Sequence, residues 1–232
     1  MKVAVIHARG GSKRIPKKNI KDFCGAPMIS YPIKVALESK LFDRVVVSTD
    51  CEEIAEVARN CGAEVPYMRP AHLADDMSTT QDALLHDVQA LGVPEYVCCI
   101  YATSPFLNAR YLEEGWNLLQ NNKNVNGCFS VTTFAFPIFR SLKMDEETGS
   151  LSMFWPEHQT TRSQDLPEAY HDAGQFYWVR GAEFLKEQKL YTKGGRAVVL
   201  PRHLVQDIDT TEDWVVAENM FKAQQLSKQA DL

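Results

Sequence analysis

Short apolar runs alternate along the chain with longer segments in which apolar residues recur at helical spacing. The continuous runs are typical of strands buried on both faces, and they cover residues 3–8, 43–50, 63–70, 95–105 and 126–134. The helical pattern covers residues 28–40, 52–62, 78–92 and 108–122. Strands that alternate with helices of this length predict an α/β fold, with a Rossmann-like, mostly parallel sheet and helices on both of its faces.

The alternation is interrupted between about 136 and 178, where prolines, aromatic residues and short alternating runs accumulate. It resumes with residues 181–188 and 196–202 and ends with a helix over 210–228. We therefore expect a single domain, residues 1–232, that carries a β-rich insertion at about 136–178.

The predicted insertion carries more aromatic side chains than a thin arm can bury by itself, among them Phe139, Phe154 and Trp155. We expect these side chains to pack against a second subunit in a two-fold homodimer, which is the commonest closed symmetry. The alternative is an arm that folds back onto its own sheet.

Composition and charge narrow the class of protein. Apolar residues make up 45% of the chain and charged residues 24%, as in ordinary globular proteins. A net charge of −5 argues against a nucleic-acid partner. No segment approaches the ~20 continuous apolar residues of a membrane span, and the first apolar run is too short for a signal peptide. We expect a cytoplasmic protein with no membrane partner, whose six cysteines are free thiols because none has zinc-ligand spacing.

The segment "HARGGSKRIPKKNIKD", residues 7–22, holds six basic side chains directly behind the first predicted strand. Loops at the carboxyl ends of strands are where ligands bind in an open α/β sheet. Glycines let the backbone approach an anion, and cations and a hydroxyl can hold it; these residues are Arg9, Gly10, Gly11, Ser12, Lys13 and Lys18. The pattern predicts an oligophosphate cradle, with a solvated basic loop as the alternative. Neither GxxxxGK[ST] nor GxGxxG is present, which disfavours a P-loop protein and a Rossmann oxidoreductase.

Within this segment, "ARGGSKRIPKKN" resembles the N-terminal signature of the sugar nucleotidyltransferases that activate nonulosonic acids, the CMP-sialate synthetases and their relatives. "FDRVVVSTD", "RPAHLADD", "ATSP" and "DIDTTED" follow in the order of that family, and "YATSPF" and "YHDAGQFYW" resemble the branch that makes CMP-pseudaminic acid. The resemblance implies a nucleotide-diphospho-sugar transferase fold. It also implies transfer of CMP from CTP to the anomeric hydroxyl of a nine-carbon 2-keto sugar acid, with release of pyrophosphate and no covalent enzyme intermediate.

The resemblance assigns residues to the two ends of CTP. It implies that Arg9, Gly10, Gly11, Ser12, Lys13, Lys18 and Asn19 bind the nucleotide phosphates. Of these, Lys18, Arg9 and Lys13 are the expected catalytic cations, with Lys18 at the transferred phosphoryl group. Arg14 stands where glycine is common and is expected to point to solvent. The segment that reads the base contributes Arg69, Ser78 and Thr80, and the alternative for Arg69 is a surface ion pair.

The remaining expected ligands are a metal ion and the sugar. Asp207 and Asp209 lie two apart, so that in an extended segment both carboxylates point the same way and suit Mg²⁺. The resemblance places them at the metal site of the family. The residues it implies for the sugar are Tyr101, Thr103, Arg162, His171 and Gln175.

The sequence departs from the sialate pattern where the sugar would be read. Tyr101 replaces a glutamine and Ala102 a proline, which weakens sialic acid as substrate and favours a differently decorated 5,7-diamino sugar. For His171, a hydrogen-bonded structural role is the alternative.

Other functions compete with a pseudaminic acid enzyme. A CMP-sialate synthetase is the main alternative, and a CMP-KDO synthetase is less favoured because its signatures around the loop differ. A non-catalytic nucleotide-binding subunit is disfavoured because Lys18, Asp207 and Asp209 are all present.

Overall fold

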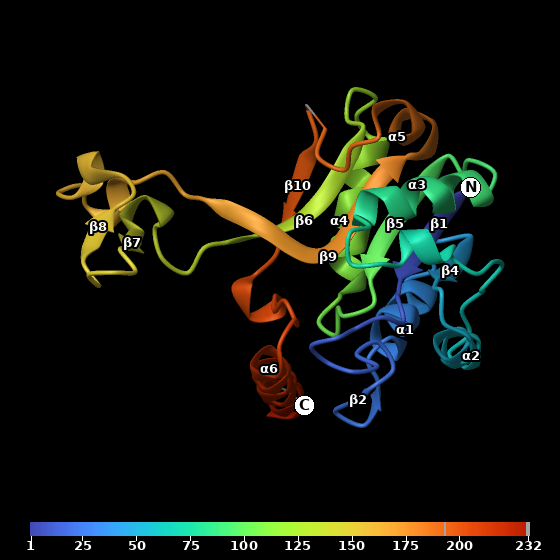
Figure 1. Ribbon diagram of the computed structural model, residues 1–232. Coiled ribbons are helices and arrows are strands. Elements are labelled where there is room, and N and C mark those ends of the chain that lie inside the picture. Colours follow the sequence, from blue (N-terminus) through green and yellow to red (C-terminus); the bar gives the residue numbers. More distant parts are fainter. Residues whose placement is uncertain (193, 231–232) are drawn as a thin grey trace.

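The computed structural model describes residues 1–192 and 194–230, without the side chains of 228–230. One six-stranded sheet organises it, in the order β10-β6-β9-β5-β1-β4 (Figure 1). The strands in chain order are β1 (Lys2–His7), β4 (Arg44–Ser48), β5 (Tyr96–Tyr101), β6 (Gly127–Thr133), β9 (Tyr170–Arg180) and β10 (Arg196–Val199). Only β9 runs antiparallel to its neighbours in this sheet of the described residues, so the predicted mostly parallel sheet is confirmed.

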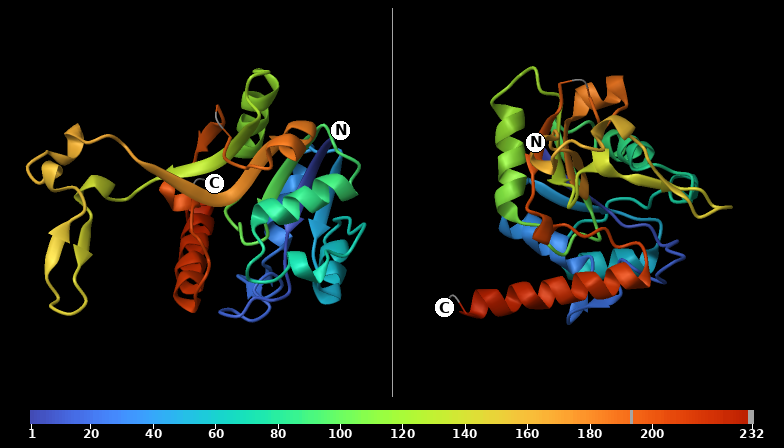
Figure 2. Two further views of the ribbon diagram at one scale, coloured as in Figure 1. Left: turned by 45° about the horizontal axis from the view of Figure 1, so that its top comes forward. Right: turned by 90° about the vertical axis from the view of Figure 1, so that its left-hand side faces the viewer.

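Helices cover both faces of the sheet, as the sequence predicts (Figure 2). One face is covered by α1 (Ser30–Glu38), α2 (Glu52–Asn60) and α4 (Ala109–Gln120). The opposite face is covered by α3 (Thr80–Ala90) and α5 (Gly181–Glu187). The strands can be continuous apolar runs because each presents side chains to a core on both sides.

The parallel strands bring the carboxyl ends of β1, β4 and β5 to one edge. His7 pairs in register with Ser48 on one side and with Tyr101 on the other. Each of these residues ends its strand with a polar side chain. The loops that follow therefore meet at this edge, which is where an open α/β sheet binds ligands.

The predicted strand over 63–70 is wrong. Glu64 forms an isolated parallel bridge to Val46, and the chain then leaves the sheet. Pro66 follows two residues later and has no N–H to continue a ladder. The backbone of Arg69 instead donates to Thr49 O at 2.7 Å, which turns the segment inward over the end of β4.

The predicted insertion is shorter than expected at its C-terminal end. The sheet of the body breaks off after β6 and resumes with β9 at Tyr170, so residues 170–178 belong to a central strand. The segment between these strands forms an arm that stands away from the body and carries a small hairpin of β7 (Leu142–Met144) and β8 (Leu151–Met153) (Figure 1). The sequence alone assigns the "QFYWV" run to the arm because its alternating pattern is the same in an arm strand as in a strand of the central sheet.

The C-terminal helix α6 (Thr211–Ala230) packs against the loop that follows β1. Trp214 and Phe23 form an edge-to-face pair in this contact, and Ile15 is buried beside them. Phe23 belongs to a small hairpin, β2 (Asp22–Phe23) with β3 (Ala26–Pro27). This packing holds residues 207–209, which precede α6, next to the basic loop. Short 3-10 turns complete the fold at Ala71–Leu73, Ile138–Arg140, Pro156–His158, Ser163–Asp165 and Arg202–Leu204.

Candidate active site

A cavity of about 220 Å³ opens at the carboxyl ends of β1 and β5, and we call it the first cavity. Sequence reasoning predicted many of the residues that line it, namely Arg9, Ser12, Lys13, Lys18, Asn19, Arg69, Ser78, Thr80, Tyr101, Thr103 and Asp209. They come from five separate stretches of the chain, which the parallel strands and the packing of α6 bring to one place. His7, Arg14 and Thr79 also line it.

Arg9 and Lys13 are held by one carboxylate on the opposite rim. Asp76 accepts from Arg9 Nη1 at 2.9 Å and from Lys13 Nζ at 2.5 Å. These hydrogen bonds lower the pKa of Asp76. The two cations are exposed, so an anionic ligand can exchange with Asp76 for them.

The two glycines of the loop do not line the first cavity, and their contact with a nucleotide stays a prediction. A Cβ on Gly10 would lie 2.8 Å from Cys51 Cβ, and Gly10 N donates to Asp50 Oδ1 at 2.8 Å. Gly10 is therefore required for the close packing of the loop against the start of α2. A Cβ on Gly11 would meet only Ala74 O at 4.0 Å, so the described packing does not require glycine there.

Lys18 and Arg14 converge on Asp209. Lys18 Nζ donates to Ile208 O at 2.6 Å and lies 3.4 Å from Asp209 Oδ1. Arg14 Nη2 lies 2.8 Å from Asp209 Oδ2. Arg14 is exposed, as expected, but its guanidinium also forms this ion pair at the first cavity. Asn19 is buried behind the loop and donates from Nδ2 to Arg9 O at 2.9 Å, which fixes the turn of the backbone.

Asp207 and Asp209 face two different cavities. Asp209 lines the first cavity, and Asp207 lines a neighbouring one. Burial, and then the charge of Asp209, raise the pKa of Asp207. A dication that reached both carboxylates would relieve this repulsion, and their oxygens are the ligand type that Mg²⁺ prefers, so a metal ion shared by the two stays a prediction. Among the described residues no group of three or more His, Cys, Asp or Glu side chains could hold a metal, so further ligands would come from the substrate and water.

Arg69 also lines the first cavity, and it is 6% exposed. Its Nε donates to Ser48 Oγ at 3.0 Å and its Nη2 to Ser48 O at 2.7 Å. The alternative of a surface ion pair is therefore wrong.

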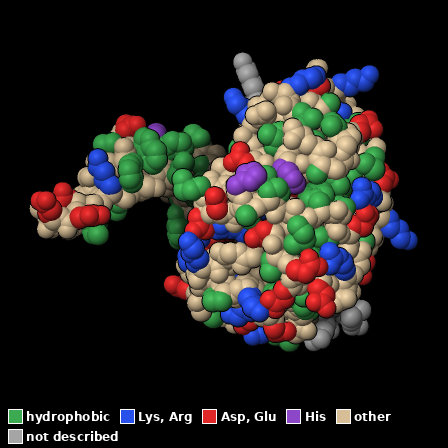
Figure 3. All heavy atoms as spheres, turned by 45° about the vertical axis from the view of Figure 1, so that its right-hand side comes forward, with side chains coloured by type: hydrophobic (Ala, Val, Ile, Leu, Met, Phe, Trp, Pro, Cys, Tyr) green, Lys and Arg blue, Asp and Glu red, His purple; other side chains and the backbone are tan. Residues whose placement is uncertain are grey.

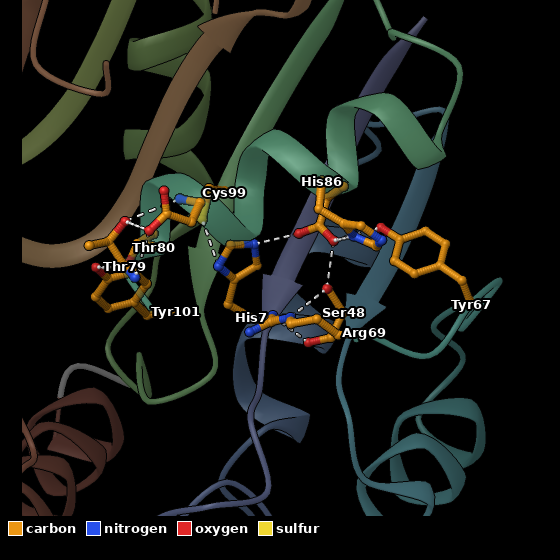
Figure 4. A network of polar contacts seen from close by, with 11 residues as sticks. His7, Ser48, Tyr67, Arg69, Thr79, Thr80, His86, Cys99 and Tyr101 are labelled. Atoms are coloured by element: carbon orange, nitrogen blue, oxygen red, sulfur yellow. Dashed lines mark hydrogen bonds and ion pairs between the residues drawn. The ribbon is translucent and has the colours of Figure 1, made fainter. Parts of the chain in front are cut away.

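A buried polar cluster that the sequence did not reveal lies behind Arg69 (Figure 4). Asp87 of α3 is fully buried, and its carboxylate contacts His7 Nε2 at 2.7 Å, Ser48 Oγ at 2.7 Å and Tyr67 Oη at 2.9 Å. Burial alone would raise the pKa of Asp87, but the bonds from His7 and Ser48 and the charge of Arg69 outweigh it and hold the pKa at about 2. Burial and the charge of Arg69 lower the pKa of His7, so the neutral ring donates from Nε2 to Asp87.

The polar groups at the start of α3 are also partnered. Ser78 Oγ lies 2.7 Å from Asp75 Oδ1 and 2.8 Å from His72 O. Thr79 caps the helix by accepting from Asp82 N, in a capping box. Thr80 Oγ1 is 2.8 Å from Tyr101 Oη, and both side chains line the cavity.

A second cavity of about 470 Å³ adjoins the first and shares Tyr101 with it. Among the residues that line it are His171, Asp172, Tyr177 and Asp207. Asp172 accepts hydrogen bonds from the Tyr177 and Tyr191 hydroxyls and from Gly174 N. His171 is exposed, and its Nδ1 donates to Asp172 O at 2.8 Å. Sequence reasoning missed Asp172 and Tyr177, although the "YHDAGQFYW" motif contains both.

Two residues predicted to contact the sugar lie outside both cavities. Gln175 is buried and donates from Nε2 to Leu204 O, so it supports the segment that carries Asp207. Arg162 is exposed on the arm and pairs with Asp165, its Nε 2.7 Å from Oδ2. Their contact with the sugar stays a prediction.

The chain shows similarity to known proteins along nearly all of its length. A family model described as cytidylyltransferase matches residues 3–225. A pseudaminic acid cytidylyltransferase of Campylobacter jejuni is 41% identical over 224 residues, 95% of this chain and 96% of that protein. N-acylneuraminate cytidylyltransferase A of Danio rerio is 34% identical over 217 residues, 93% of this chain and 49% of that protein. A solved CMP:2-keto-3-deoxy-manno-octonic acid synthetase in complex with CTP shares the fold, with a TM-score of 0.71 at 16% identity over 96% of this chain and 99% of that one.

Proposed function

Because the chain belongs to the cytidylyltransferase family, we propose that it transfers CMP from CTP to the anomeric hydroxyl of a nonulosonic acid, and that this acid is pseudaminic acid. The anomeric oxygen attacks the α-phosphorus, the bond to the bridging oxygen of the β-phosphate breaks, and pyrophosphate leaves. The observation that carries the proposal is the pair of adjoining cavities, which share Tyr101 and are flanked by Asp209 and Asp207.

We assign CTP to the first cavity. Its phosphate end consists of Arg9, Ser12, Lys13 and Lys18, whose cations exchange Asp76 and Asp209 for phosphate oxygens. Its base end consists of Arg69 and the residues that hold it. Lys18 Nζ donates to Ile208 O, and Ile208 stands between Asp207 of the second cavity and Asp209 of the first. We therefore place Lys18 where the two substrates meet.

We assign Mg²⁺ to Asp207 and Asp209, whose oxygens match its preference for hard ligands. When bound, this cation neutralises charge on the phosphates. Asp209 would then leave Lys18, which frees this cation for the triphosphate.

The second cavity suits a sugar acid with polar substituents. Asp172 is fixed by two tyrosine hydroxyls, and Tyr101 stands at the junction with the first cavity. These groups replace the amide side chain that the sialate pattern carries at Tyr101. The similarity to N-acylneuraminate cytidylyltransferases keeps sialic acid as the second candidate.

The arm supports a homodimer as part of this proposal. Phe139 and Trp155 pack on each other within the arm, whereas Phe154 remains 55% exposed. Further hydrophobic side chains are exposed on it, and Figure 3 shows them gathered on the arm; they are Phe136, Leu142, Met144 and Leu151. A surface of this kind on a protruding hairpin fits a second copy of the chain, which would bring Arg162 toward the partner's second cavity.

The dimer is tested by light scattering at micromolar concentration. We expect a dimer for the native chain and a monomer for Leu142→Asp together with Leu151→Asp. A matched control adds the same two charges to α6, by aspartate at exposed Val215 and Leu226. A monomeric native chain would contradict the dimer.

The reaction is tested by incubating the protein with CTP and Mg²⁺ and offering pseudaminic acid, sialic acid and KDO separately. We expect pyrophosphate release with pseudaminic acid above the other two. Faster release with sialic acid would favour the second candidate, and CTP binding with no release for any sugar would favour a non-catalytic subunit.

We place the reaction in the cytoplasm, where CTP is made. The free cysteines, of which Cys98, Cys99 and Cys128 are buried, fit a reducing compartment. No helix of the described residues is both long and apolar enough to cross a membrane.

A further inference from the structure

Two charged side chains of the described residues are buried, and they carry opposite charges. Arg69 is 6% exposed and Asp87 is fully buried. They are linked through Ser48, whose hydroxyl donates to Asp87 Oδ1 at 2.7 Å and accepts from Arg69 Nε at 3.0 Å. Burying such charges is costly unless each is paired and hydrogen-bonded, so this arrangement needs a reason beyond packing.

Attachment of α3 to the sheet does not supply that reason. Leu84 and Val88 of α3 are fully buried against Val3, Val5 and Val46 of the sheet, so apolar contacts already hold the helix. The polar cluster instead reaches the first cavity, because two of its members, His7 and Arg69, line it.

The cluster restricts the orientation of the Arg69 guanidinium. Its Nε and Nη2 are both directed at Ser48, and its backbone N–H is held by Thr49 O. Among the described residues Nη1 has no hydrogen-bond partner, and the side chain lines the first cavity. One edge of a planar fork is thereby fixed, and the other is left for a ligand (Figure 4).

The cluster also fixes the orientation of Ser48. Its hydroxyl hydrogen is directed to Asp87, which leaves the oxygen lone pairs for Arg69. His7 Nε2 and Tyr67 Oη donate to the same carboxylate and hold it in place. The order of support therefore runs from Asp87 through Ser48 to Arg69.

We propose that Asp87 is a positioning residue for base selection, which acts through Ser48 to hold Arg69 toward the cytosine of CTP. Cytosine offers N3 and O2 as adjacent acceptors, whereas N3 of uracil carries a hydrogen. A fixed N–H donor accepts the first base and repels the second, and a loosened donor discriminates less. This inference rests on the proposed binding of CTP in the first cavity.

The test compares CTP and UTP binding by calorimetry, with turnover as a separate readout. Ser48→Ala removes the link and Asp87→Asn removes the charge. We expect each to weaken CTP binding about 10-fold and to lower the CTP-over-UTP preference about 10-fold, with kcat at saturating CTP changed less than about 3-fold. Ser130→Ala is the matched control, because it removes another buried serine hydroxyl, whose hydrogen bonds go to the backbone of Phe176 and not to Asp87 or Arg69. It should retain the full preference.

A double-mutant cycle separates positioning from a structural role. In the Arg69→Gln background, Ser48→Ala should cause no further loss of preference, because the residue through which it acts is gone. Additive losses would overturn the proposal, as would an unchanged preference in Ser48→Ala. If Asp87→Asn does not fold, the Ser48→Ala variant and its double-mutant cycle with Arg69→Gln test the proposal by themselves.

The binding readout keeps this inference separate from the proposed reaction. Wild-type protein that prefers CTP over UTP but releases no pyrophosphate with any sugar would contradict the proposed function and leave the inference standing. Wild-type protein that binds both nucleotides equally would overturn the inference even if the sugar is activated.

Discussion

At the phosphate end of the first cavity, the Lys13 side chain is 80% exposed and is held by Asp76. At the base end, Arg69 is 6% exposed and is held by Ser48 above a buried carboxylate. The exposed cations have exchangeable partners and can follow phosphates and a metal ion through a reaction. The buried cation is fixed before any ligand arrives. One cavity thus combines adaptable charge where bonds change with rigid charge where a base is selected.

The largest effect should come from the carboxylates at the phosphate end. Asp209→Asn or Asp207→Asn should lower kcat on the order of 10³-fold at ordinary Mg²⁺, because a neutral amide binds a hard dication poorly. Steady-state assays over a range of Mg²⁺ concentrations measure this. Asp76→Asn is the matched control, since it removes a carboxylate that only competes for Arg9 and Lys13. Equal loss in the control would show that net charge, and not metal binding, matters.

Lys18 should give the next largest effect. Lys18→Ala and Lys18→Arg should each lower kcat about 10²-fold, the usual order for one electrostatic stabiliser, and weaken CTP binding far less. The lysine is 18% exposed and fits between Ile208 O and Asp209, where a longer planar guanidinium cannot replace an ammonium. Comparison of kcat with calorimetric CTP affinity checks this. A normal kcat in Lys18→Ala would show that the proposed alignment of the loop with the phosphates is wrong.

The buried cluster behind Arg69 should make the stability of the protein depend on pH. The pKa of His7 is lowered from 6.5, so between 6.5 and its folded value the unfolded chain binds a proton that the folded chain does not. Stability therefore falls as the pH drops below about 6.5 toward the lowered folded-state pKa, by at most ~1.4 kcal/mol per pH unit for this one group. Urea unfolding at several pH values measures the slope.

His7→Gln should flatten that slope, whereas the same change at exposed His203 should not. Asp87, Arg69 and Cys99 surround the ring, and none of them is changed by either variant. An unaltered slope in His7→Gln would contradict a neutral His7.

The smallest effect should come from Arg14. Its side chain is 64% exposed and its pair with Asp209 is a surface ion pair, which is worth ~0–1 kcal/mol. Arg14→Ala should therefore change kcat by no more than about 3-fold. The same steady-state assay measures this change in kcat. A loss as large as that of Lys18→Ala would show that Arg14 acts on the phosphates.

The sequence by itself determined the elements that depend on local pattern. Alternation of buried runs and amphipathic helices predicted the α/β sheet, because a strand covered on both faces must be apolar throughout. The basic loop after β1 and the Asp207–Asp209 pair were also visible, because their charges lie in short contiguous stretches of the chain. The strand predicted at 63–70 failed because one bridge at Glu64 and the proline after it leave no ladder to extend.

Only the tertiary structure decided which polar side chains meet. Asp87 lies within an ordinary amphipathic helix and Arg69 in a loop, and nothing in their spacing shows that Ser48 joins them. Gln175 was predicted to face the sugar, yet its buried amide donates to Leu204 O. Local sequence determines which side chains of a helix or strand face the core. A buried charge also needs a hydrogen-bond partner. That partner comes from a distant segment, which the packing of helix on sheet brings close.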